Sequence, residues 1–241
     1  LGTGDYATLP EAVKNVPPNS TIILDVGMYF LDERLLIEKS ITLIGAGDNQ
    51  SVVSGSNPEG GALVAFFGPG QLNIEGITFE YTGSPGVHVL YVEDGQVNIQ
   101  SNRFTGVALI EDEEIDGYGI YLAGNTTGTI EANKIYWNGK FGIKASGQSN
   151  LAILSNEVTE NGWSGIGIDE QAVVTLEGNY TVQNGESGIV FFDNSQGTVR
   201  NNTSTNNGKS GIAVQDQAQA TIENNTFENN TAGAEGAGLY L

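Results

Sequence analysis

Two series of residues recur in this sequence with one constant 23-residue period. The asparagine series consists of Asn133, Asn156, Asn179, Asn202 and Asn225. The glycine series, in which each Gly precedes an isoleucine, consists of Gly119, Gly142, Gly165, Gly188 and Gly211. Two series with the same period indicate that one structural unit is stacked on copies of itself. A unit of this length, rich in Gly and Asn and without a helical apolar pattern, is typical of one turn of a parallel β-solenoid.

Each repeat predicts three short strands. A first β segment leads to the periodic Asn, a second leads to an Asn-Gly turn, and Gly-Ile opens a third. Alternation along these segments places Ile130, Ile120 and their equivalents inside. We interpret the asparagine series as a ladder at a tight bend, because Asn tolerates left-handed backbone and its amide can bond the coils on both sides.

The predicted fold is all-β, a single-stranded right-handed parallel β-helix of about ten coils in one domain, residues 1–241. The regular coils are expected over residues 72–241, and residues 1–71 hold a cap and irregular first coils. Thr8, Pro10 and Glu11 supply a hydroxyl cap, an early proline and an acidic first turn, which predict a short N-terminal capping helix.

Charge and composition limit the partners. The formal net charge is −20, with 29 acidic and 9 basic residues, so nucleic acid and anionic membranes are disfavoured. The same charge favours a neutral glycan over an anionic one unless a cation bridges the two. There is no cysteine, which excludes disulfides and thiolate chemistry, and no apolar run is long enough for membrane insertion. Because the sequence begins with neither a signal peptide nor an initiating Met, we expect a mature or excised fragment. We also expect an extracellular or cell-surface location.

Two stretches resemble a known family. The segment DYATLPEAVKNVPPNSTIILDVGMYFLDERLLIEKSITLIGAG, from Asp5 to Gly47, resembles the opening of pectin-lyase-like right-handed β-helices. The repeats of the form NxxxxNGxxGI resemble those of carbohydrate-binding and sugar-hydrolase domains. The resemblance implies the fold but is shared by glycan enzymes, surface adhesins and binding modules. The catalytic signatures of pectin methylesterases, polygalacturonases and mannuronan epimerases are missing, so no catalytic residue is carried over.

The third strand of each coil carries the candidate chemistry, because the resemblance implies that this face lines a substrate groove. The second residue after each Gly should point outward, which would stack His88, Tyr121 and Lys144 side by side. A base, a phenolic acid and a cation together suit proton abstraction beside a uronate carboxylate. The alternative is a polar outer face without function.

An acidic insertion precedes this strand. The interval from Asn102 to Asn133 is longer than the standard period. The extra residues include Glu111, Asp112, Glu113, Glu114 and Asp116. Such a run of carboxylates could bind Ca²⁺ through oxygen ligands, although it lacks the spacing of an EF-hand. The alternative is a solvated acidic loop.

Aromatic and polar residues near this strand complete the predicted groove. The expected substrate-binding residues are Tyr118, Trp137, Lys140, Trp163 and Asp169. Exposed rings bury the C–H faces of sugars. The leading hypothesis is therefore a carbohydrate-engaging β-helix module for a polysaccharide or oligosaccharide, with lyase or epimerase activity as its enzymatic form. The alternative is a non-catalytic structural or protein-binding solenoid. An open strand edge at the C-terminal end predicts end-to-end or side-by-side association.

Overall fold

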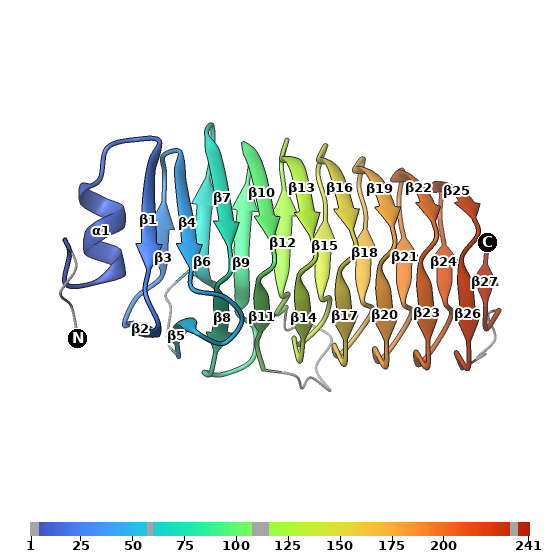
Figure 1. Ribbon diagram of the computed structural model, residues 1–241. Helices are drawn as coiled ribbons and strands as arrows, with labels where there is room; N and C mark the ends of the chain where they lie inside the picture. Colours follow the sequence, from blue (N-terminus) through green and yellow to red (C-terminus); the bar gives the residue numbers. More distant parts are fainter. Residues whose placement is uncertain (1–4, 57–59, 108–115, 232–235) are drawn as a thin grey trace.

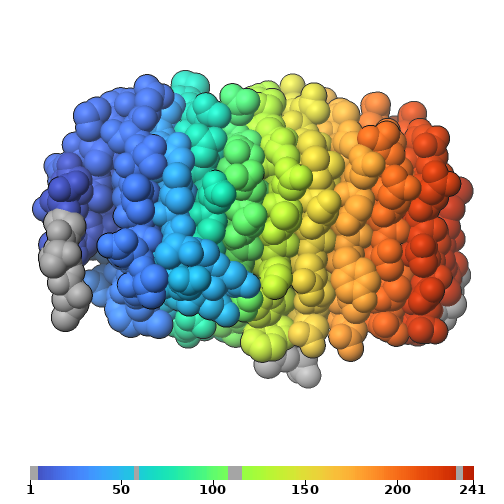
Figure 2. Space-filling model, in the orientation of Figure 1, coloured from blue at the N-terminus to red at the C-terminus, as the bar shows by residue number. Residues whose placement is uncertain are grey.

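The computed structural model describes residues 5–56, 60–107, 116–231 and 236–241. It is a rod of stacked coils that starts with one short helix and continues as three parallel sheets (Figure 1). Each sheet has nine strands, close to the predicted ten coils. In the space-filling view the coils follow one another along the rod in the order of the sequence (Figure 2).

Every coil contributes one strand to each sheet, and consecutive coils pair in parallel. Sheet A contains β1 (Ser20–Leu24), β4 (Ile41–Gly45), β7 (Gln71–Glu75), β10 (Gln96–Gln100), β13 (Thr127–Glu131), β16 (Asn150–Leu154), β19 (Val173–Glu177), β22 (Gln196–Arg200) and β25 (Gln219–Glu223). Sheet B contains β2 (Gly27–Leu31), β5 (Ser51–Gly55), β8 (Thr78–Tyr81), β11 (Arg103–Thr105), β14 (Lys134–Tyr136), β17 (Glu157–Thr159), β20 (Tyr180–Val182), β23 (Thr203–Thr205) and β26 (Thr226–Glu228). Sheet C contains β3 (Leu35–Ile37), β6 (Ala62–Phe67), β9 (His88–Glu93), β12 (Ile120–Ala123), β15 (Ile143–Ala145), β18 (Ile166–Ile168), β21 (Ile189–Phe191), β24 (Ile212–Val214) and β27 (Leu239–Tyr240).

The core runs along the axis of the rod, between the three sheets. The predicted inward positions are buried there: Ile130 and Ile153 in sheet A, and Ile120 and Ile143 in sheet C, have no exposed surface. Identical or similar side chains lie over one another because the register pairs equivalent residues of successive coils, as Ile130 pairs with Ile153. The two-residue alternation of a strand thus turns the sequence repeat into continuous apolar columns.

The helix α1 (Leu9–Asn15) covers the first coil, as predicted. The Thr8 hydroxyl accepts a hydrogen bond from the backbone N–H of Glu11 at 3.2 Å, which satisfies one of the free donors of the first turn. Leu9 and Val13 are buried in the main core. The helix therefore supplies apolar cover for an end of the solenoid that would otherwise face water.

Asparagine ladders hold two of the three corners. At the corner between sheets A and B, the Asn179 Oδ1 accepts hydrogen bonds from the backbone N–H and the amide of Asn156, at 3.0 and 3.1 Å. The amide of Asn179 donates in turn to Asn202 at 3.0 Å. This ladder was predicted, but its backbone reason was wrong: the left-handed residue is the one before each ladder asparagine, such as Ser155 with φ 54°.

A second asparagine ladder occupies the corner between sheets B and C. It consists of Asn138, Asn161, Asn184, Asn207 and Asn230. From the sequence the first four of these residues were interpreted only as parts of Asn-Gly turns. Each is again preceded by a left-handed residue, among them Trp137 with φ 56° and Glu160 with φ 53°. Buried amides that satisfy one another fix the register of the coils at both corners.

Candidate functional site

The outer surface of sheet C carries a layer of aromatic side chains. Tyr118 and Phe141 are buried in this layer, and Tyr121, Trp163 and Phe192 pack against them while keeping part of their surface exposed. We call these five residues, together with His88 and Tyr91, the aromatic face. Strand register explains part of it: Tyr91 and Tyr121 are partners in the outward column of sheet C. Tyr118 and Phe141 both lie directly before a periodic glycine, in the preceding row.

The outward face of sheet A differs from this layer. Its central column consists of Thr21, Thr42, Asn73, Asn98, Thr129, Ala152, Thr175, Thr198 and Thr221. These short, mostly polar side chains need no cover. An apolar layer outside the core therefore distinguishes sheet C from sheet A.

A glycine makes room for the aromatic layer. The Phe141 ring lies over Gly167, and a Cβ at Gly167 would approach the ring to 2.6 Å. Gly167 follows Lys144 in the outward column of sheet C. The missing side chain thus lets the Phe141 ring pack closely against the sheet, where it also contacts Trp163 at 5.9 Å between ring centroids.

His88 does not lie in the predicted column with Tyr121 and Lys144. Tyr121 pairs with Tyr91, not with His88, and with Lys144 on its other side. The backbone N–H of Val89 bonds the carbonyl of Tyr118, so His88 shares a row with Tyr118. The error came from the choice of Gly86 as the equivalent of the periodic glycines: this turn is irregular, and the equivalent position is Val89. Nevertheless, the His88 ring lies 4.7 Å from the Tyr118 ring and 5.2 Å from the Tyr121 ring.

His88 is arranged as a neutral hydrogen-bond donor. Its burial lowers the pKa to about 4, although the nearby Asp116 carboxylate acts in the opposite direction. Its Nδ1 accepts a hydrogen bond from the backbone N–H of Tyr118 at 3.2 Å. The proton of the neutral ring is therefore assigned to Nε2. A ring in this tautomer has no lone pair left for a substrate proton.

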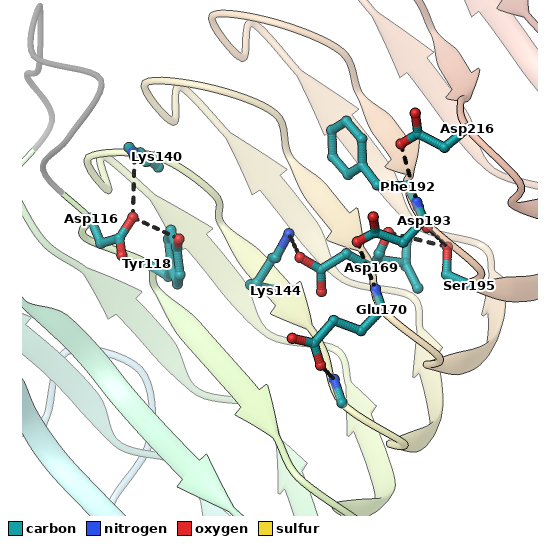
Figure 3. A network of polar contacts seen from close by, with 12 residues as sticks. Asp116, Tyr118, Lys140, Lys144, Asp169, Glu170, Phe192, Asp193, Ser195 and Asp216 are labelled. Carbon is teal, nitrogen blue, oxygen red and sulfur yellow. Dashed lines mark hydrogen bonds and ion pairs between the residues drawn. The ribbon is translucent and has the colours of Figure 1, made fainter.

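Lys144 has its charge enclosed within the face. Its ammonium pairs with Asp169 at 2.5 Å and lies 4.5 Å above the Phe141 ring centroid and 5.4 Å from that of Phe192. The residue is only 7% exposed. Figure 3 shows the Lys144–Asp169 pair at the centre of the polar network of this face. The second oxygen of Asp169, Oδ1, is buried without a hydrogen-bond partner. A buried ion pair of this kind holds its partners in place.

A second buried lysine lies at the corner between sheets B and C. Lys140 is 6% exposed, pairs with Asp116 at 3.1 Å and lies 4.3 Å above the Trp163 ring. The same Asp116 oxygen accepts a hydrogen bond from the Tyr118 hydroxyl at 2.8 Å (Figure 3). Partial burial works to raise the pKa of Asp116, but the bonds from Tyr118 and Lys140 outweigh it and hold the pKa below its usual value.

The tyrosines of the face are kept protonated. Burial, followed by the hydrogen bond to Asp116, raises the pKa of Tyr118. Burial also raises the pKa of Tyr121 and of Tyr91, and Tyr91 donates to the Glu93 carboxylate at 2.9 Å. At neutral pH these phenols are hydrogen-bond donors and not bases.

Acidic residues border the face at the corner between sheets C and A. The Glu170 carboxylate accepts a hydrogen bond from the backbone N–H of Gly147 at 2.8 Å, and the Asp193 carboxylate does the same for Glu170 at 3.2 Å. Asp216 continues the series (Figure 3). Glu170, Asp193 and Asp216 all have left-handed backbone, so they form a corner ladder like those of asparagine. Their carboxylates therefore have a structural role at the corner, and they also place negative charge beside the aromatic face.

Trp137 lies on the other side of the corner from the aromatic face. It directly follows β14 of sheet B, and the buried segment 138–142 separates it from β15 of sheet C. Its indole N–H donates to the Glu160 carboxylate at 2.9 Å. Trp137 therefore does not share a groove with His88 and Tyr121, contrary to the prediction, whereas Lys140, Trp163 and Asp169 lie against the face.

The predicted calcium ligands fall mainly outside the described residues. Glu111, Asp112, Glu113 and Glu114 lie in the segment 108–115. Asp116 is described, and its Oδ1 is already bonded by Lys140 and Tyr118. Within the described ranges, no three acidic or histidine side chains cluster closely enough to hold a metal ion. Calcium binding by residues 111–116 stays a prediction. The same ranges contain no helix with the length and apolarity to cross a membrane.

Tyr91 belongs to the face but was not predicted from the sequence. It pairs with Tyr121, which lies more than one standard period later, so counting by the period could not find it. An alternating pattern in the segment HVLYVE was the available signal: Leu90 and Val92 are buried on either side of a half-buried Tyr91.

Comparison with known proteins identifies the family to which this fold belongs. Over residues 86–241, more than half of the chain, the sequence matches the family model described as a right handed beta helix region. No match was found among curated proteins. The structure is similar to pectate lyase Pel9A, with 13% identity and a TM-score of 0.66, covering 89% of this chain and 64% of that one. It thus spans less than two thirds of the length of that enzyme.

Two further solved structures are similar. The A-module of the Azotobacter vinelandii mannuronan C-5 epimerase AlgE6 has 18% identity and a TM-score of 0.53, with 91% of this chain and 70% of that chain covered. The alginate lyase of Paenibacillus sp. str. FPU-7 has 15% identity and a TM-score of 0.51, with 97% and 95% covered. At these identities the likeness establishes the fold alone. The stacked parallel coils and the family match together show that the chain belongs to the right-handed β-helix family.

Proposed function

We propose that the protein is a carbohydrate-engaging β-helix module and that it binds a glycan on the aromatic face of sheet C. The observation that carries the proposal is the apolar layer on the outside of this sheet, with Tyr121, Trp163 and Phe192 half-buried and available. Rings of this kind pack against the C–H faces of pyranoses, and the phenol of Tyr121 can hydrogen-bond sugar hydroxyls. The similar solved structures include a pectate lyase and an alginate lyase, which supports a carbohydrate ligand.

The charges favour a neutral glycan. Lys140 and Lys144 are each paired with a carboxylate, so neither presents a bare cation to a uronate. Glu170, Asp193 and Asp216 lie along one border of the face. An anionic chain would meet net negative charge there, unless a divalent cation bridged it. An extracellular or cell-surface site of action accords with this ligand class.

Polysaccharide lyase or epimerase activity is the second candidate, because the similar solved structures include two polysaccharide lyases and an epimerase. Proton abstraction needs a base with a free lone pair near the substrate. Among His88, Tyr121 and Lys144, the histidine accepts a backbone N–H, the phenol has a raised pKa, and the ammonium is paired. The geometry therefore supports binding better than turnover. Release of unsaturated products from pectate or alginate, lost in Tyr121→Phe, would instead establish catalysis.

A glycan array of neutral oligosaccharides, followed by titration calorimetry of the best ligand, tests the proposal. Phe192→Gln and Trp163→Glu remove rings and place residues that the chain itself carries one period later, Gln215 and Glu186. These variants are expected to fold and to lose about tenfold or more in affinity, since buried aromatic contacts dominate such interfaces. Tyr180→Thr, which removes an exposed ring from sheet B, is the matched control and should bind normally. Unchanged affinity in both ring variants would refute the site, and absence of binding to every glycan of the array would favour the non-catalytic scaffold or protein-binding alternative.

A further inference from the structure

Trp137 occupies a position where the later coils place short or flexible polar residues. Its equivalents one to four periods later are Glu160, Gln183, Asn206 and Asn229, all with left-handed backbone. A bulky aromatic side chain is uncommon in that conformation. In addition, 52% of the surface of Trp137 is exposed. A residue that is costly for the backbone and does not contribute to the core points to a role in binding.

The indole ring is fixed in place. Its N–H bonds the Glu160 carboxylate at 2.9 Å, and its ring meets that of Tyr136 edge-on at 5.1 Å. Tyr136 is itself held by Arg103, which donates to the phenol oxygen at 3.2 Å and lies 5.6 Å from the ring centroid. Arg103 in turn pairs with Asp48 at 2.6 Å. The platform is thus ordered before any ligand arrives, which lowers the entropic cost of binding.

An open hollow of about 500 Å³ lies beside this ring, at the ends of β8, β11 and β14. Its lining combines the aromatic rings of Trp137 and Tyr136 with hydrogen-bonding groups. The polar part consists of Glu80, Thr82 and Thr105. An aromatic wall with a few hydroxyl and carboxylate groups is the composition expected of a sugar site.

We propose that this hollow is a second glycan subsite, separate from the aromatic face, that takes a neutral pyranose unit stacked on Trp137. The carboxylate of Glu80 accepts hydrogen bonds from sugar hydroxyls and disfavours a uronate at the same place. The two sites lie on opposite sides of the corner between sheets B and C, so one polysaccharide chain or two can engage both. The inference rests on the proposed function for its ligand class, but the two sites can be tested apart.

The two tryptophans of the chain provide separate reporters, because Trp163 belongs to the aromatic face and Trp137 to the hollow. In Trp163→Phe the fluorescence reports only on the hollow, and in Trp137→Phe it reports only on the face. Both variants are titrated with cellohexaose, xylohexaose, mannohexaose and chitohexaose, and with hexagalacturonate as the anionic comparison. The subsite predicts a saturable change in Trp163→Phe with at least one neutral hexasaccharide and none with hexagalacturonate.

Trp137→Asn is the decisive variant, since asparagine occupies the equivalent position at Asn206 and Asn229 and suits left-handed backbone. The variant should fold at least as well as the wild type, and it should lose about tenfold in affinity at the hollow as measured by calorimetry. Tyr180→Thr again serves as the control. A response of Trp163 without any response of Trp137 overturns the subsite and leaves the proposed function intact. Affinity unchanged in Trp137→Asn also overturns the subsite, and silence of both reporters overturns both proposals.

Discussion

The single histidine gives the aromatic face a measurable pH signature. Burial lowers the pKa of His88 to about 4, whereas an unfolded histidine titrates near 6.5. The unfolded chain therefore binds more protons than the folded one between these values, and stability falls as pH decreases from about 6.5 to about 4. At pH 5 the loss relative to neutral pH is about 2 kcal/mol from this group alone.

Urea unfolding followed by circular dichroism at pH 7, 6 and 5 measures this loss. His88→Gln is the control, because a glutamine amide can still accept the Tyr118 N–H but does not titrate. The variant is expected to be less stable at pH 7, since it loses the ring contacts with Tyr118 and Tyr121, yet its stability should change little down to pH 5. A parallel NMR titration is unambiguous with one histidine in the chain. A pKa near 6.5, or the same pH slope in both proteins, would refute the proposed burial of His88.

Three further changes test the packing that supports the site. Asn179→Ala removes a buried amide that bonds the coils on both sides, so urea unfolding should show a destabilisation of about 2–4 kcal/mol. Asn225→Ala, at the partly exposed end of the ladder, should cost less than half of that. Equal losses in the two variants would contradict the ladder account. Gly167→Ala places a methyl group against the Phe141 ring, so thermal unfolding should show a destabilisation of about 1–3 kcal/mol, and an unchanged melting temperature would count against the packing described. Lys144→Met keeps the apolar contacts but leaves a carboxylate unpaired, so a destabilisation of about 3 kcal/mol is expected, and a neutral effect would show that the ion pair is not buried in solution.

The repeat made most of the fold predictable from the sequence. A constant period fixes which side chains become neighbours, so the buried columns of Ile130 and Ile120 followed directly. The cap of α1 at Thr8 was predictable because capping depends on a few adjacent residues. The left-handed positions were predicted one residue too late, at the ladder asparagines, because Asn adopts left-handed backbone more readily than most residues. The left-handed residue is the one before each asparagine, and its type varies from coil to coil.

The site was harder to predict because it departs from the repeat. His88 precedes the long insertion, where counting residues fails, and only strand pairing shows that Tyr91 continues the column of Tyr121. The burial of Lys144 also escaped prediction. An outward position was assumed to be exposed, but Phe141 and Phe192 cover it from neighbouring coils. Contacts of this kind depend on side-chain direction, which a pattern of residue types does not contain.

The central claim is that a neutral glycan binds on the outside of sheet C. Hydrogen–deuterium exchange with and without the tightest neutral oligosaccharide tests it most directly. The account predicts slower exchange over residues 88–93, 118–123 and 163–168, with little change over the strands of sheet A. Slowing confined to sheet A, or no slowing anywhere under saturating ligand, would contradict it.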